Sequence, residues 1–111
     1  RDFKPLMKAL KKEWREDWAL ALETIGDEDA LSRLATLNSL AKINTDSVAL
    51  EIVKARLAMA AGLGADAKHY IERASALDAD NPLVHLLRLE IETGRTEALE
   101  KLRRRLIEDT F

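Results

Sequence analysis

The stretch that decides the fold is VALEIVKARLAMAAGLGADAKHYIERASALDADN, residues 48–81. Its first half reads as a helix that ends in small residues before Gly62. Its second half carries Ala67, Ile71 and Ala74 on one helical face and closes in a polar turn. The stretch therefore predicts two helices joined by a tight turn at Gly62.

The same helix pair recurs along the chain with a period of about 34 residues. Leu37 and Leu40 stand 34 positions before Ile71 and Ala74. Glycines mark the expected turns at spacings of 36 and 32 residues: Gly26, Gly62 and Gly94. Because one such pair cannot bury its apolar stripe alone, we expect neighbouring pairs to stack and share a continuous core.

The remaining helices are predicted from caps and breaks in the sequence. Residues 5–25 are too long for one helix of such a pair, so we expect a break between Trp14 and Asp17. Ser47 is expected to cap the helix that follows it. Asn81, followed by proline, marks the start of the helix after residue 81. The sequence thus predicts an all-α chain of six or seven helices, forming about three repeats of an α-solenoid.

Composition limits the class of protein. A chain of 111 residues fits one domain, so we expect a single helical repeat domain over residues 1–111. The net charge of −2, from 18 basic and 20 acidic residues, gives no general attraction to nucleic acid. The absence of cysteine excludes thiolate zinc sites and cysteine nucleophiles. Since the first residue is Arg1 and not Met, we expect a piece of a longer protein.

The helix-pair pattern resembles the tetratricopeptide-repeat (TPR) superfamily. The pattern A…I…A…LD carries this resemblance in the second helix of the clearest repeat: Ala67, Ile71, Ala74, Leu77 and Asp78. The Trp, Gly and Tyr expected in a consensus first helix are missing, and Ala79 stands where Pro is usual. The resemblance implies a non-enzymatic scaffold whose stacked antiparallel hairpins bind a protein or a peptide.

A narrower resemblance joins the chain to the C-terminal region of the HemY family, which are bacterial inner-membrane TPR proteins associated with late haem biosynthesis. Four segments carry it: ALKKEW (9–14), LSRLATLNSLAKINTDS (31–47), MAAGLGADAKHYIERA (59–74) and LLRLEIETG (86–94). The family usually has Trp where this chain has Gly64. The resemblance implies a scaffold that organises late haem-biosynthesis enzymes at the inner membrane. Its tether would be an N-terminal membrane-spanning part outside this sequence, and the fragment itself is expected to be soluble.

The first helices of the repeats are expected to line an inner surface. In that register the predicted partner-binding groove has seven residues: Trp18, Leu22, Ile52, Arg56, Met59, Leu86 and Glu90. The groove would be mostly apolar, with one basic and one acidic residue. We therefore expect its ligand to be an amphipathic helix or an extended apolar segment.

Two alternatives stay open beside the haem-linked scaffold. One is a generic TPR adaptor or assembly factor with no link to haem. The other is a direct haem or porphyrin carrier that uses His69 or His85, the two histidines of the chain. They lie 16 residues apart with no third ligand of matching spacing, so we expect no metal site and no cofactor.

Catalysis is not expected. The sequence has no G-x-S-x-G, Walker or G-x-G-x-x-G motif, and its paired acids stand at helix starts or beside Lys and Arg. Arg103, Arg104 and Arg105 form a basic run in the last predicted helix. Two interpretations of this run stay open: contact with phosphate or an anionic lipid surface, and favourable placement of cations near a helix C-terminus.

Overall fold

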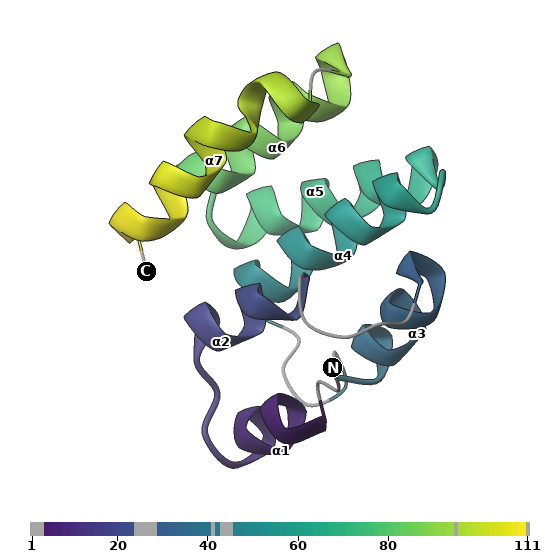
Figure 1. The fold of residues 1–111 in the computed structure, drawn as a ribbon, viewed down its shortest axis with the longest axis vertical. Helices are drawn as coiled ribbons and strands as arrows, with labels where there is room; N and C mark the ends of the chain where they lie inside the picture. The colour runs from purple at the N-terminus through teal and green to yellow at the C-terminus, as the bar shows by residue number, and fades with distance from the viewer. Residues whose placement is uncertain (1–3, 24–28, 41, 43–45, 95, 111) are drawn as a thin grey trace.

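The computed structural model describes residues 4–23, 29–40, 42, 46–94 and 96–110, without the side chains of residues 96–98 and 110. These residues form seven α-helices and a short 3-10 turn, and no strand occurs among them (Figure 1). The helices are α1 (Lys4–Lys12), α2 (Glu16–Leu20), α3 (Ala30–Leu40), α4 (Val48–Ala60), α5 (Gly64–Leu77), α6 (Pro82–Thr93) and α7 (Thr96–Thr110), with the turn η1 (Ala21–Glu23) after α2. For the residues that the structure describes, the prediction of an all-α fold with six or seven helices is confirmed. None of these helices has the length and apolar content that crossing a membrane requires.

Side-chain caps start the central helices where the sequence predicts them. Ser47 begins α4, and its Oγ accepts a hydrogen bond from the Leu50 amide at 3.0 Å. Asn81 begins α6 in the same way, because its Oδ1 accepts from the Leu83 amide at 2.9 Å. Pro82 then occupies the first turn, where its missing amide proton costs no helical hydrogen bond. Both predicted caps are confirmed.

An acidic cap precedes α3. The Oδ1 atom of Asp29 accepts a hydrogen bond from the Ser32 amide at 2.8 Å. This bond to the charged form holds the pKa of Asp29 below its ordinary value. Asp29 therefore acts as the N-cap of this helix.

Two of the predicted turn glycines have a backbone conformation that favours glycine over other residues. Gly62 has φ of 78° and Gly94 has φ of 69°, in the left-handed region that residues with a side chain rarely adopt. Gly64 differs, because it is the first residue of α5 and has an ordinary negative φ. Gly26, the third predicted turn residue, lies outside the described residues.

Helix α4 lies at the centre of the molecule (Figure 1). It contacts α2 and α3, which precede it, and α5 and α6, which follow it. Its alanines Ala49, Ala55 and Ala58 are fully buried and allow the neighbouring helices to approach closely. The helices α2, α4 and α6 lie in a row, while α3 packs against α4 and α5 packs against both α4 and α6. Successive helices thus stack around α4 and share its core.

Helix α7 turns back over this row. It packs against α6, and its Arg103 reaches Glu23 of η1, 80 residues earlier in the chain. Its Ile107 meets Leu20 of α2, Ile52 of α4 and Leu86 of α6 around one small cavity. We call the surface that α7 covers the inner face, and define it by these residues: Leu20, Glu23, Ile52, Arg56, Leu86 and Glu90.

One apolar residue of the repeat pattern is not buried in the core. Leu77, which belongs to the A…I…A…LD pattern, is the last residue of α5, and 38% of its surface is exposed. Ala67, Ile71 and Ala74 of the same helix are buried as predicted. The inward face of α5 therefore ends one turn before the helix does.

Candidate functional site

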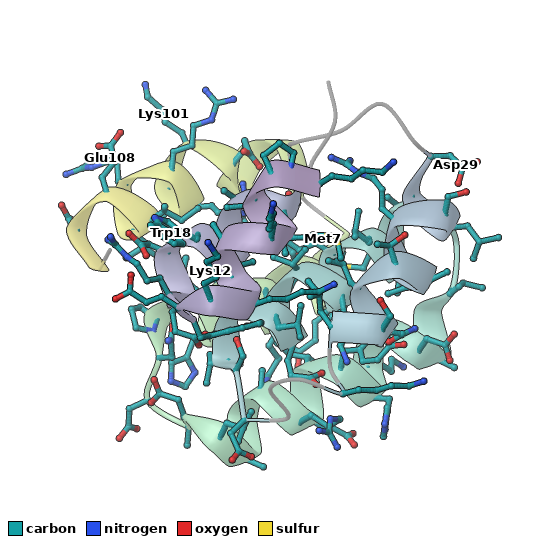
Figure 2. The ribbon with its side chains drawn as sticks, turned by 90° about the horizontal axis from the view of Figure 1, so that it is seen from below. Met7, Lys12, Trp18, Asp29, Lys101 and Glu108 are labelled. Carbon is teal, nitrogen blue, oxygen red and sulfur yellow. The ribbon has the colours of Figure 1, made fainter. Side chains whose placement is uncertain are left out.

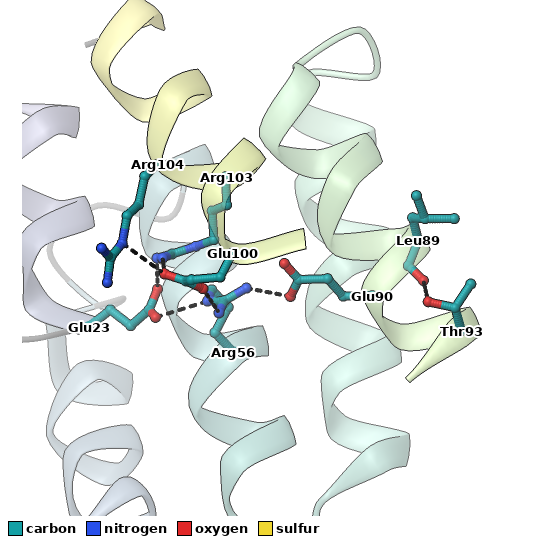
Figure 3. A network of polar contacts seen from close by, with 8 residues as sticks. All are labelled: Glu23, Arg56, Leu89, Glu90, Thr93, Glu100, Arg103 and Arg104. Carbon is teal, nitrogen blue, oxygen red and sulfur yellow. Dashed lines mark hydrogen bonds and ion pairs between the residues drawn. The ribbon is translucent and has the colours of Figure 1, made fainter. Parts of the chain in front are cut away.

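Arg56 of α4 is the centre of a polar network on the inner face (Figure 3). Its Nε donates a hydrogen bond to Oε2 of Glu23 at 2.9 Å, and its Nη1 donates to Oε2 of Glu90 at 2.5 Å. Its Nη2 lies 3.6 Å from Oε2 of Glu100, which is an ion pair and not a direct hydrogen bond. One guanidinium group therefore joins carboxylates from η1, α6 and α7.

Arg103 of α7 is the second cation of this network. Its Nη2 donates to Oε1 of Glu23, and its Nη1 donates to Oε1 of Glu100 at 3.0 Å. Arg104 approaches the same Glu100 oxygen at 3.5 Å from a largely exposed position. Three carboxylates thus face two enclosed guanidinium groups, and Arg104 compensates the remaining negative charge from the rim.

Burial and charge act in opposite directions on Arg56. Burial lowers the pKa of Arg56, but the carboxylates of Glu23 and Glu90 reverse this, so that the pKa lies above its ordinary value. The side chain of Glu90 is 0% exposed, and its Oε1 has no hydrogen-bond partner. Glu90 therefore depends on Arg56, because a buried carboxylate without a counter-charge is strongly unfavourable.

A cavity of about 370 Å³ lies beside this network. Its walls come from η1, α3, α4 and α6: Glu23, Ala30, Arg33, Arg56, Leu57, Met59, Ala60 and Glu90. Cavities of this size, with an apolar wall and a few charged groups, are typical of binding sites for small ligands or for one or two side chains of a partner. This cavity is the candidate functional site.

The predicted groove is partly corrected by the structure. Leu22, Ile52, Leu86 and Glu90 were expected to line an open surface, but all four are buried. For Ile52, Leu86 and Glu90 the physical reason is α7, whose Arg103 and Ile107 close over these residues around one small cavity. Leu22 is instead part of the buried core cluster. The structure does bring Ile52, Leu86 and Glu90 together on one face, as the repeat register predicts.

The other three predicted groove residues are more accessible. Met59 is half-buried and lines the cavity, where Arg56 forms part of the charged wall. Trp18 is also half-buried but does not line the cavity, and the Arg15 guanidinium lies 4.6 Å from its ring centre. The cavity residues that were not predicted are Glu23, Ala30, Arg33, Leu57 and Ala60, and Glu100 and Arg103 belong to the network beside the cavity.

A second polar cluster joins the N-terminal helices to α4. Oε2 of Glu16 accepts hydrogen bonds from Nε1 of Trp14 at 2.7 Å and from Oγ of Ser47 at 2.5 Å. Its Oε1 accepts from the Ala49 amide at 3.0 Å. A carboxylate of α2 thus satisfies the start of α4, where the helix dipole favours a negative charge. This cluster fixes the stacking of α2 on α4.

A third cluster holds α5 against α4. Oε1 of Glu51 lies 3.1 Å from Nζ of Lys54 and 3.1 Å from Nε of Arg73. Nζ of Lys54 also lies 4.8 Å from the ring centre of Tyr70. Glu51 stands in the first turn of α4, but its carboxylate serves this helix contact and not the cap. Glu51 and Lys54 are buried, and Arg73 joins them from an exposed position.

The structure gives the histidines no common site. His69 on α5 and His85 on α6 are both exposed. No group of three or more His, Cys, Asp or Glu side chains suited to a metal ion occurs within the described part of the chain. In the basic run, Arg103 is buried in ion pairs, so phosphate contact is open only to Arg104 and Arg105.

Comparison of the chain with protein-family models, with curated proteins and with solved structures found no match. The resemblance to TPR proteins, and to the HemY family in particular, stays a prediction from the sequence.

Proposed function

We propose that this chain is a non-enzymatic protein-binding scaffold, an α-solenoid of the TPR kind that takes its partner at the cavity beside Arg56. The observation that carries the proposal is the meeting of four elements, η1, α3, α4 and α6, around one cavity of about 370 Å³. Stacked helix pairs create such shared concave surfaces, and binding is their usual function.

The lining defines the kind of partner. Leu57 and Met59, with two alanines of α3 and α4, give an apolar wall that suits an aliphatic or aromatic side chain. Glu23 and Arg56 give a charged wall that fixes orientation by hydrogen bonds. An amphipathic helix or an extended apolar segment with one apolar anchor fits this combination.

The test is selection of binding peptides from a random display library with the full chain as bait. We expect Met59→Glu to weaken the selected peptides at least tenfold, because it places a third carboxylate beside Glu23 and Glu90 in the apolar part of the cavity. Leu89→Glu is the matched control, since Leu89 is exposed on α6 and does not line the cavity. Circular dichroism checks that both variants fold.

Unchanged affinity of the Met59→Glu variant, or equal losses in both variants, would contradict binding at the cavity. A library that yields no binding peptide at all would contradict the scaffold proposal itself.

A more specific proposal rests on the HemY resemblance alone. In the full-length protein the scaffold would organise late haem-biosynthesis enzymes at the bacterial inner membrane. Pull-down from bacterial membrane extract, read by mass spectrometry, tests it. Recovery of late haem-pathway enzymes that is lost with Met59→Glu supports the haem link. Recovery of an unrelated set favours a generic adaptor and contradicts the haem link.

A further inference from the structure

We propose that α7 occupies the inner face as a built-in substitute ligand, and that the partner is an amphipathic helix which displaces it. The partner helix would carry the pattern of α7: an acid, a base three residues later and an apolar residue four residues after that, as in Glu100, Arg103 and Ile107. This inference rests on the proposed function and specifies its partner.

The attachment of α7 is unusual because a charge is its most deeply buried group. Among the described side chains of α7, Arg103 alone is buried. Leu106 and Ile107 are only partly buried, and 47% of Leu102 is exposed. By contrast, α4 and α5 bury several apolar side chains each. Helix α7 is therefore positioned mainly by ion pairs.

Attachment by enclosed ion pairs is specific but gives little net stability. Removing Arg103 and Glu23 from water has a desolvation cost that offsets most of their attraction. A second helix that carries an acid and a base in place of Glu100 and Arg103 can replace α7 without leaving Glu23 or Arg56 unpaired. Elements with few buried apolar contacts are also the ones that open first within a folded protein. Displacement of α7 is thus the least costly way to uncover the inner face.

A cleft that is open to solvent lies at the edge of α7. A cavity of about 260 Å³ lies between α7 and α2, and its lining includes Leu20, Ala21, Arg104 and Ile107. A partner helix with a larger apolar side chain at the position of Ile107 would fill this space. This cleft therefore gives a partner helix an apolar contact beyond those that α7 makes.

Two exposed residues on the outer side of α7 serve as controls for substitutions in the ion-pair network. Lys101 projects away from the body of the protein (Figure 2), and both Lys101 and Arg105 are exposed. Substitution of these two residues removes two charges from α7 without touching the inner face. The pair Glu100 and Arg103, in contrast, points into the network around Arg56 (Figure 3).

The test uses a fluorescent peptide with the sequence of residues 96–110, added to the full chain and followed by anisotropy. We expect the double variant Glu100→Ala with Arg103→Ala to bind it at least tenfold more tightly than the wild type, because its own α7 competes less. The double variant Lys101→Ala with Arg105→Ala should bind like the wild type. A control peptide with Glu100 and Arg103 exchanged should not bind.

Equal affinity of the peptide for the wild type and for the Glu100→Ala, Arg103→Ala variant, or no binding to this variant while it is folded, would overturn the proposal. If this variant does not fold, hydrogen exchange of the wild type decides. We expect the amides of α7 to be at least tenfold less protected than those of α4. Equal protection of the two helices would overturn the proposal. Cavity binding is scored separately, since selected peptides that are lost with Met59→Glu support the scaffold whether or not α7 opens.

Discussion

At the scale of single residues, Arg56 neutralises the acidic side chains of the inner face. Glu90 is a fully buried acid on α6, and such a residue needs a counter-charge when it is enclosed. The planar guanidinium of Arg56 supplies it and, with its remaining donors, serves Glu23 and Glu100 as well. A lysine at this position could not form the same set of directed bonds.

This arrangement predicts the effect of removing the cation. Arg56→Ala should lower the free energy of unfolding by about 3–5 kcal/mol, because it leaves Glu90 buried without a partner. Urea denaturation followed by circular dichroism measures the change. The double variant Arg56→Met with Glu90→Leu should recover most of the loss, since it removes both charges and keeps the volume.

A loss below about 1 kcal/mol for Arg56→Ala, the range of exposed ion pairs, would contradict the enclosed network. So would a double variant that is no more stable than Arg56→Ala.

The same residues show how much of the site could be predicted. The repeat register predicts Ile52, Arg56, Met59 and Glu90 as neighbours on one face, because one helical period relates successive first helices. The sequence contains no comparable signal for Arg103, which stands there as one member of a basic run. The predicted register places Glu90 on the same face as Arg56, but it gives no sign of a second cation beside them.

At the scale of helices, sequence-based prediction succeeds where a local interaction sets the boundary. Ser47 and Asn81 start helices through their own side chains, and Gly94 ends one through its left-handed conformation. These signals lie within a few residues of the boundary they set. The contact between Glu16 and the start of α4 spans 33 residues and has no such local signal.

Two neighbouring glycines provide a matched prediction at this scale. Gly62→Ala should destabilise the fold by about 1 kcal/mol, because alanine is strained at a φ of 78°. Gly64→Ala should leave stability unchanged or raise it by about 0.4–1 kcal/mol, because Gly64 is helical and a Cβ there meets no atom within 4 Å. Thermal unfolding of both variants measures the difference, and an equal effect of both would contradict the assigned turn.

At the scale of the whole molecule, the position of α7 separates this structure from a simple stack. Short connections and repeat periodicity predict a last helix that continues the array. Instead, the ion pair between Arg103 and Glu23 holds α7 against η1, which directly follows α2. That contact joins residues 80 positions apart, so neither periodicity nor local propensity could predict it.

The position of α7 over the inner face is the central claim, and one cross-linking measurement tests it directly. Ala21 of η1 and Arg104 of α7 line the same cavity, and the chain has no cysteine of its own. With Ala21→Cys and Arg104→Cys, a short bismaleimide should form an intramolecular cross-link in high yield. Ala21→Cys with Lys68→Cys on α5 is the control pair and should react poorly. A cross-linking yield between the η1 and α7 positions that is no higher than the yield of the control pair would contradict the account.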